Sequence, residues 1–309
     1  MSTFESRKKS RELNEKLIKL ALISAAAISI LTTFGILFSI LFEAIEFFKL
    51  RSFWYFITGT TWSPGVIGSQ FGALPIFAGT FVITIIALGV AIPIGLGSAI
   101  YMSEYASPKV RDYLKPLLEI LAGIPSVVYG FFAAITVAPL VVKAAESIGL
   151  EATFNSALAS GIVMGIMIIP TISSLSDDVI RAVPDSQRKA AFGLGMTHGE
   201  TIKDIVLPSA MPGIISASLL ALSKALGETM VVVMAAGLRP NLSWNPLEDM
   251  TTVTVTIVNA LVGDFEFSSP ETLSAFALGL VLFVVTLILN MISLSLIRKF
   301  KEKYKVNTL

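Results

Sequence analysis

The sequence predicts an all-α membrane protein with six transmembrane helices. Of its 309 residues, 54% are hydrophobic and only 15% are charged, with a mean hydropathy of +0.79. A soluble domain has about 25% charged residues. The charges are also spaced so that they leave several uncharged stretches, and about 20 apolar residues in a helix suffice to cross the hydrocarbon core of a bilayer.

The positions of the charged residues define the six predicted spans. Four long apolar stretches lie between charges, at 20–42, 120–142, 152–176 and 272–297. The uncharged run 52–103 is too long for one helix, and WSPGVIGSQFG at 62–72 interrupts it with glycines and a proline. We therefore expect a helix at about 73–101, after an aromatic segment at 53–57. The last predicted span, at about 212–237, contains two ionisable residues, Lys224 and Glu228.

The distribution of Lys and Arg predicts the orientation. With both termini in the cytoplasm, the inner segments hold 17 of these residues and the outer segments hold four, as expected because positive charge is retained on the cytoplasmic side. The predicted divisions are a basic cytoplasmic N-terminus (1–16), a first transmembrane helix with an extracytoplasmic segment (17–72), a core of five transmembrane helices (73–297) and a basic cytoplasmic tail (298–309). The first span is too long for a signal peptide, so we expect it to be retained in the inner membrane.

The composition also excludes several kinds of chemistry. The chain has no cysteine and one histidine, His198, which argues against a thiolate or histidine metal site and against a histidine-based catalytic triad. No Gly-x-x-x-x-Gly-Lys-Ser/Thr loop for binding nucleotide phosphates is present. We therefore expect no metal, no bound cofactor and no enzymatic activity in this chain.

The longest inner loop, at 176–211, is polar and has signals for two short helices. Pro184 can begin the first helix and Gly195 can end it. Thr197 and Glu200 match a capping box for the second helix, which Pro208 should stop. Apolar residues at 202, 205 and 206 would give this second helix an apolar side. The simplest interpretation is an ordinary structured loop.

The spacing within KAAFGLGMTHGETIKDIVLP, at 189–208, resembles the coupling-loop signature of ABC importer permeases, E-A-A-x-x-x-G-x(9)-I-x-L-P. The matching residues are Ala190, Ala191, Gly195, Ile205, Leu207 and Pro208, whereas Lys189 stands where the family has glutamate. The resemblance implies the type I ABC importer (MetI-like) fold. It also implies that the loop, at 180–208, is a cytoplasmic helix-turn-helix that binds a separate ATPase subunit, in which ATP and Mg²⁺ would bind.

Lys224 and Glu228 are the ionisable residues within a predicted span. Such residues are costly at mid-membrane and usually line a pathway or pair with each other. Their spacing of four residues would place them on one face of a helix. They could form a self-neutralising pair that stabilises the bundle. Alternatively, Lys224 could attract an anion while Glu228 balances the charge or accepts a hydrogen bond from a protonated ligand.

Four further segments resemble the permeases of the phosphate-specific importer, and the WSP…FGALP element is similar to the C-type permease in particular. They are FGALPIFAGT, GLGSAIYMSEYAS, LEILAGIPSVVYGFF and GETMVVVMA. The family has arginine where Lys224 stands. The resemblance implies import of inorganic phosphate by a heterodimer with an A-type permease, two ATPase copies and a phosphate-binding protein that docks on the outer segments, 43–71 and 238–271. It implies no nucleic-acid partner.

Other features predict a gate and a packing site. The proline in LAGIPSVVYG breaks a span, so Pro125, Ser126 and Tyr129 are candidates for a gate. GIVMG at 161–165 has small residues at a spacing that lets helices pack closely, and His198 is interpreted as a solvated residue. Three alternative functions remain open: a permease for molybdate or sulfate, a proton-coupled secondary transporter that uses Glu228, and a membrane scaffold or sensor that transports nothing.

Overall fold

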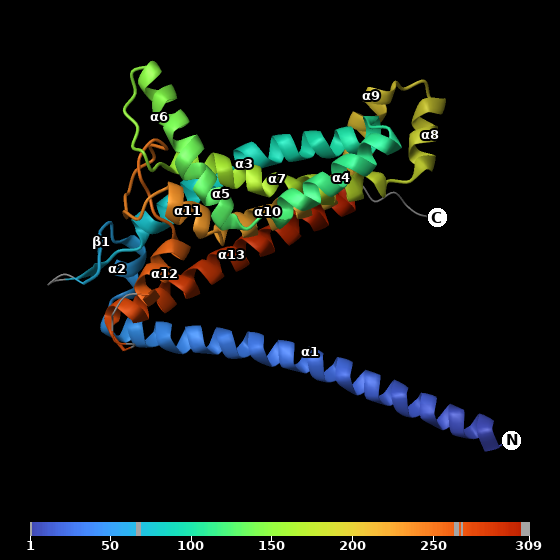
Figure 1. The fold of residues 1–309 in the computed structure, drawn as a ribbon, viewed down its shortest axis with the longest axis horizontal. Coiled ribbons are helices and arrows are strands. Elements are labelled where there is room, and N and C mark those ends of the chain that lie inside the picture. Colours follow the sequence, from blue (N-terminus) through green and yellow to red (C-terminus); the bar gives the residue numbers. More distant parts are fainter. Residues whose placement is uncertain (1, 66–68, 263–265, 267, 304–309) are drawn as a thin grey trace.

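The computed structural model describes residues 2–65, 69–262, 266 and 268–303, with side chains described between residues 14 and 299 of these ranges. Within them the chain is almost entirely helical (Figure 1). The elements are α1 (Ser2–Leu50), α2 (Phe53–Thr58), β1 (Trp62–Ser63), β2 (Gln70–Phe71), α3 (Leu74–Ile100), the π-helical turn η1 (Tyr101–Tyr105), α4 (Pro108–Gly123), α5 (Ser126–Phe132), the π-helical turn η2 (Ala133–Val137), α6 (Ala138–Ser147), α7 (Ala157–Arg181), α8 (Asp185–Gly193), α9 (His198–Thr201), the π-helical turn η3 (Ile202–Val206), α10 (Leu207–Leu226), α11 (Met230–Ala235), α12 (Val253–Val262) and α13 (Pro270–Lys303).

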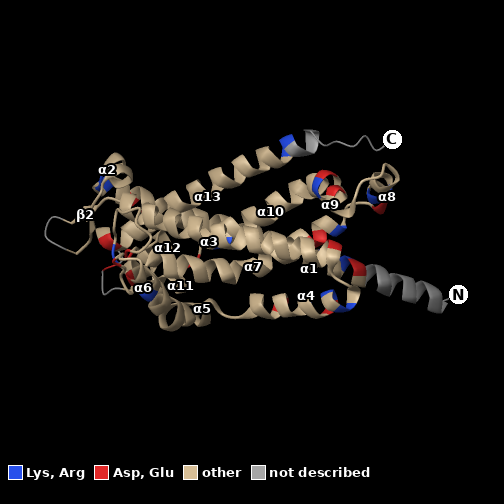
Figure 2. Cartoon of the chain, turned by 90° about the horizontal axis from the view of Figure 1, so that it is seen from above, with Lys and Arg blue, Asp and Glu red and all other residues tan. Residues whose placement is uncertain are grey.

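Among the residues that the structure describes, six helical segments are long and apolar enough to span a membrane, which confirms the predicted number. They are Asn14–Leu50, Leu74–Tyr105, Ser126–Ser147, Ala157–Arg181, His198–Leu226 and Pro270–Lys299. Charged residues gather at the two ends of the bundle, and its middle is almost free of them (Figure 2). This distribution fits a bilayer around the middle, because charged side chains are costly in hydrocarbon.

Two predicted spans are broken in the structure. The third, at 120–142, breaks between α4 and α5, where Ile124 and Pro125 leave the helical conformation, as the proline in LAGIPSVVYG predicts. The fifth predicted span, at 212–237, crosses the boundary between α10 and α11. Sequence hydropathy does not distinguish these breaks from continuous helix, because the residues on both sides of each break are apolar.

Helices α3 and α7 form the centre of the bundle, and glycines let them approach closely. A Cβ atom at Gly165 would lie 2.7 Å from Cβ of Val90, and one at Gly161 would lie 2.7 Å from Cγ2 of Ile86. Both distances are shorter than a carbon–carbon contact at its energy minimum, about 3.5–4.0 Å. The prediction that the GIVMG segment serves helix packing is therefore confirmed.

Helix α1 is attached to the bundle at one end only. Phe47, near its C-terminus, packs edge-to-face against Phe56 and Phe71, with ring centroids 5.3 Å and 5.5 Å away. From this cluster α1 runs away from the bundle as a single helix (Figure 1). None of the residues in its most hydrophobic stretch is buried. A long apolar surface on α1 is thus left uncovered by the rest of the chain.

The bundle has two distinct ends. The end that carries α8 and α9 is called the loop end below. The segments that contain the three tryptophans, α2, β1 and the connection between α11 and α12, lie at the opposite end, called the tryptophan end (Figure 1). There, β1 and β2 form a short antiparallel pair in which Trp62 faces Phe71. The segment predicted as a loop thus contains a short strand at each end, Trp62–Ser63 and Gln70–Phe71.

Candidate functional site: the coupling loop and a pair of broken helices

The loop between α7 and α10 folds as the two short helices that its sequence predicts. Pro184 precedes α8, and Gly195 follows it with a φ of +83°. The amide of Gly195 donates to the carbonyl of Phe192 at 3.0 Å, and the amide of Met196 donates to that of Ala191 at 3.1 Å. These two bonds are the Schellman ending of a helix, which requires a left-handed residue at the position of Gly195.

The second helix of the loop begins with the predicted capping box. The Thr197 hydroxyl accepts from the Glu200 amide at 3.4 Å, and the Glu200 carboxylate accepts from the Thr197 amide at 2.8 Å. Two backbone amides that the helix leaves unpaired at its start are satisfied in this way. Local hydrogen bonds therefore hold both helices of the loop, so its shape does not depend on a partner.

The prediction that Pro208 stops the second helix is wrong. The chain continues from α9 through η3 into α10, with Pro208 in the first turn of α10. A proline fits the first turn of a helix because its missing N–H is not needed there. In η3 the Leu207 amide bonds the Ile202 carbonyl, so the regular α-helical pattern is already interrupted before the proline. The coupling loop is consequently joined to a membrane span by continuous helix.

The apolar side of the second helix is turned toward the protein itself. Ile202 and Val206 are buried and Ile205 is half-buried, and Val206 belongs to a cluster with Ala99 of α3 and Ile180 of α7. The apolar side chains that the loop presents outward are instead Phe192 and Leu194, which are 46% and 84% exposed. Composition alone does not distinguish the two sets, because burial depends on how the loop is packed on the bundle.

The signature residues occupy different environments within the loop. Lys189, Ala190 and Gly195 are exposed, Ala191 is buried, and Ile205, Leu207 and Pro208 are half-buried. His198 is exposed, as the interpretation of it as a solvated residue predicts, but it also makes ring contacts. Its ring lies edge-to-face on Tyr105 with centroids 5.1 Å apart, and it stacks on Phe192 at 6.3 Å. The histidine therefore joins α9 to α8 and to the end of η1.

Lys224 and Glu228 do not share a helix face, contrary to the prediction, because α10 ends at Leu226. The Glu228 carboxylate instead accepts hydrogen bonds from the amides of Met230 at 3.0 Å and Val231 at 3.3 Å, so it caps the start of α11. Lys224 is exposed on α10 and forms no ion pair with any side chain that the structure describes. The self-neutralising pair is therefore not formed.

The candidate gate lies against the second broken helix. The hydroxyl of Tyr129 in α5 donates to the carbonyl of Leu121 in α4 at 2.9 Å, which bridges the break at Pro125. A Cβ atom at Gly130 would lie 2.9 Å from Sδ of Met234 in α11. The structure thus packs α5, which follows the break at Pro125 and Ser126, against α11, which follows the break after Leu226. This contact was not predicted, because the two segments are about 100 residues apart.

An ion-pair cluster that the sequence analysis missed holds α4 on α7 near the loop end. Nη2 of Arg111 donates to Oδ2 of Asp177 at 2.8 Å, and Lys115 lies 3.8 Å from the same oxygen and 2.6 Å from Oδ1 of Asp178. The Asp177 side chain is fully buried. Its hydrogen bond to Arg111 raises the pKa of that guanidinium above its ordinary value.

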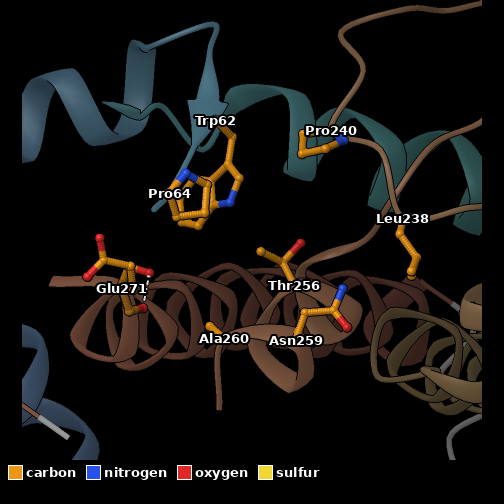
Figure 3. A pocket seen from close by; sticks show the side chains of 9 residues that line it. Trp62, Pro64, Leu238, Pro240, Thr256, Asn259, Ala260 and Glu271 are labelled. Atoms are coloured by element: carbon orange, nitrogen blue, oxygen red, sulfur yellow. Dashed lines mark hydrogen bonds between the residues drawn. The ribbon is translucent and has the colours of Figure 1, made fainter. Parts of the chain in front are cut away.

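At the tryptophan end, the two outer segments meet around a cavity of about 230 Å³ (Figure 3). Trp62 and Pro64 line it from the first outer segment, and Leu238 and Pro240 line it from the second. Residues of α12 and of the beginning of α13 complete the wall: Thr256, Asn259, Ala260, Glu271 and Ser274. The connection after α11 is ordered by Glu248, whose carboxylate accepts from Asn241 at 2.8 Å and from Asn245 at 3.0 Å.

Comparison with known proteins agrees with the fold and with the loop. The model of the family described as "Binding-protein-dependent transport system inner membrane component" matches residues 91–303. The chain is 32% identical over 303 residues to "Probable ABC transporter permease protein YqgH" of Bacillus subtilis, covering 97% of this chain and 95% of that protein. It is 34% identical to "Phosphate transport system permease protein PstC" of Mesorhizobium japonicum, covering 86% and 84%. The protein named PstC 1 of Mycobacterium tuberculosis is 32% identical, covering 83% and 85%.

Solved structures share the fold at low sequence identity. A bacterial alginate ABC transporter, in complex with a pentasaccharide-bound periplasmic protein, aligns with a TM-score of 0.60 and 16% identity, covering 88% of this chain and 92% of that one. The MetNI methionine ABC transporter in an inward-facing conformation aligns with a TM-score of 0.53 and 15% identity, covering 72% and 93%. With these folds and the family match over residues 91–303, the chain belongs to the family of inner-membrane components of binding-protein-dependent transport systems.

Proposed function

We propose that this chain is the permease subunit of an ATP-driven ABC importer of inorganic phosphate. It forms half of the translocation pathway and couples to a separate ATPase through the loop at 189–208. The observation that carries the proposal is the loop itself. It is held by its own caps, it presents Phe192 and Leu194 to the outside, and it continues as helix into a membrane span. A preformed apolar knob of this kind suits a protein partner, because little ordering entropy is lost on binding.

Phosphate is the proposed substrate because several relatives are named phosphate permeases and because Lys224 is an exposed cation within a span. An unpaired ammonium facing lipid is costly, so an aqueous pathway or a partner chain should face it. Next to it in sequence, the Ser223 hydroxyl donates to Oδ1 of Asn290 in α13 at 3.4 Å. We infer that Lys224 attracts the anion, whereas Glu228 contributes by holding α11 in place at the edge of the pathway.

The partners follow from the surfaces that the chain leaves uncovered. The exposed apolar length of α1 would pack against a second permease, which we propose is the related A-type subunit. Two copies of a cytoplasmic ATPase, which would bind ATP and Mg²⁺, would dock at the loops of the two permeases. An extracytoplasmic phosphate-binding protein would dock at the tryptophan end, over the cavity that both outer segments line. In this arrangement the loop end and both termini face the cytoplasm.

The contact between α5 and α11 is the proposed gate. The break at Pro125 gives α5 a pivot, and the tight packing of Gly130 on α11 would make the two segments move together. Ser126 and Tyr129 lie on the moving side of this pivot. Non-helical backbone within a membrane protein is tolerated where it is covered by protein or lines an aqueous cavity, which fits a gate beside the pathway.

The first experiment tests docking of the ATPase. A Leu194→Asp variant, co-expressed with the second permease and the ATPase, should no longer retain the ATPase during purification, because a charge would be placed in an apolar contact. Leu150→Asp is the matched control, since Leu150 is also exposed but lies outside the loop, before α7. Retention of the ATPase by Leu194→Asp would remove the loop from the proposed function.

The second experiment tests the substrate. In proteoliposomes that contain the whole complex, labelled phosphate should be taken up, and excess sulfate or molybdate should not compete. Lys224→Gln should lower uptake about 10- to 100-fold, because a hydrogen bond to a charged group contributes about 1.5–3 kcal/mol. Lys224→Arg keeps the positive charge and should therefore retain most of the phosphate uptake. Equal uptake by wild type and Lys224→Gln would exclude the proposed role of Lys224.

A further inference from the structure

Glu104 lies at the loop end of α3, within η1, and is the point where this helix meets the coupling loop. Its side chain is only 7% exposed. One oxygen, Oε1, accepts a hydrogen bond from Nη2 of Arg188 in α8 at 2.8 Å. The other, Oε2, lies 3.9 Å from Nε2 of His198 in α9. A single carboxylate of α3 therefore faces a basic residue from each of the two loop helices.

Arg188 also binds the end of α7. Its guanidinium donates to the carbonyl of Ile180 at 2.9 Å and to the carbonyl of Val183. The Arg188 side chain is 16% exposed, so it faces the bundle and not a docking partner. The neighbouring Lys189 is exposed. Because a planar guanidinium holds its acceptors in fixed directions, Arg188 fixes the position of α8 relative to both α3 and α7.

The covalent connections give Glu104 a particular importance. The loop continues along the chain into α7 on one side and into α10 on the other, so both helices must follow it. Helix α3, the central partner of α7, has no such connection, because Glu104 and Arg188 are 84 residues apart in sequence. The apolar cluster that contains Ala99 and Val206 also joins α3 to the loop region, but apolar packing is non-directional.

We propose that the Glu104–Arg188 ion pair is the joint through which the coupling loop moves α3, so that Glu104 is a positioning residue for transport. The inference rests on the proposed function, in which an ATPase moves the loop. The π-helical form of η1 supports it, since the Ala106 amide bonds the Tyr101 carbonyl and the regular ladder of α3 is interrupted where Glu104 lies. Such single π-turns occur frequently at functional sites.

The experiment compares phosphate uptake with ATP hydrolysis in the reconstituted complex. Glu104→Gln keeps the shape of the side chain and removes its charge, so uptake should fall at least about tenfold while the ATPase still co-purifies. The matched control is Asp185→Asn. Asp185 also faces Arg188, at 3.6 Å, but its side chain is 82% exposed, so uptake should change less than about twofold. Wild-type uptake by Glu104→Gln, or loss of the ATPase from its complex, would overturn the proposal.

A second variant separates a joint from a merely structural ion pair. The chain contains no cysteine, so Glu104→Cys and Arg188→Cys can be combined without background labelling of this chain. Uptake by this double variant should be low, and a short thiol cross-linker should restore it in the same purified sample. Failure of the cross-link to restore uptake would refute the joint. If instead the wild-type complex takes up another oxyanion and not phosphate, the proposed substrate is wrong, and uptake of that ion is then measured in the same variants to test the joint.

Discussion

Replacement of Gly195 by valine tests whether the shape of the coupling loop matters for transport. A Cβ atom at this position would have nothing within 4 Å, so the substitution causes no clash within the chain. Its effect must come from the backbone, because the φ of +83° lies in the left-handed region. An L-residue pays about 1–2 kcal/mol for this conformation, and a β-branched residue such as valine is less tolerant still.

The competing term is the pair of hydrogen bonds that end α8. The bonds made by the amides of Gly195 and Met196 contribute about 1 kcal/mol each. Strain of about 1–2 kcal/mol is therefore comparable with what holds the turn, and it lowers the ratio of native to non-native turn about five- to thirtyfold. Because the two bonds hold that ratio at about 30, the native turn would fall to about half of its population at the upper end of the strain. We expect Gly195→Val to insert and to lose phosphate uptake by up to about twofold, because the turn sets the angle between α8 and α9.

Two controls distinguish backbone shape from lost contact surface. Gly195→Asn should transport nearly as well as wild type, because asparagine adopts the left-handed conformation more readily than other residues. Gly199→Val places the same side chain in the same loop, at a glycine without positive φ and with nothing within 4 Å. The measurement is labelled-phosphate uptake at equal protein in the membrane. Uptake by Gly195→Val equal to that of wild type, or an equal loss in Gly195→Asn, would refute the reasoning.

Three further predictions concern stability in detergent, measured by thermal unfolding. Asp177→Asn should lower the free energy of unfolding by about 3–5 kcal/mol, because it removes one partner of a buried ion pair. Asp178 is half-exposed, so Asp178→Asn should lower it by less than about 1 kcal/mol. Equal effects of the two substitutions would contradict the role of burial. Gly165→Ala should lower the free energy of unfolding by about 1–3 kcal/mol, because the added methyl group overpacks against α3. Gly97→Ala should not lower it, because a Cβ atom at Gly97 has nothing within 4 Å. Hydrogen bonds from Asn241 and then Asn245 lower the pKa of Glu248 below its ordinary 4.5. The stabilisation of the folded protein by these hydrogen bonds is thus present above pH 4.5 and is lost as the pH falls through the lower pKa that Glu248 has in the folded state. Glu248→Gln should be less stable than wild type at neutral pH, and a difference that persists in strong acid would count against this.

The coupling loop could be predicted closely because its signals are local. Gly195 ends α8, and Thr197 with Glu200 caps α9, each through hydrogen bonds between residues at most five apart in sequence. Pro208 shows the limit of such reasoning. A proline is compatible with a helix when it falls in the first turn, and here a π-turn, whose Val206 is buried inside the bundle, precedes it.

The pair Lys224 and Glu228 could be selected from the sequence but not placed. Their presence in an apolar span marks both as unusual, yet a spacing of four residues brings two side chains together only if the helix is continuous. The break after Leu226 separates them and turns Glu228 into the cap of α11. Similarly, the cluster of Arg111, Lys115 and Asp177 lies at charged ends of separate segments, and no local pattern connects them.

By itself, the sequence determined the membrane environment, the number of spans, the use of GIVMG for close helix packing, and the capped loop. These properties depend on hydropathy, residue size and hydrogen bonds between near neighbours. Only the tertiary structure decided that the fifth predicted span breaks after Leu226, which side of the loop is buried, and that Glu104 meets Arg188. The reason is physical: each of these outcomes depends on contacts between segments distant in sequence, whose free energies are small individually and take effect only once the bundle has assembled.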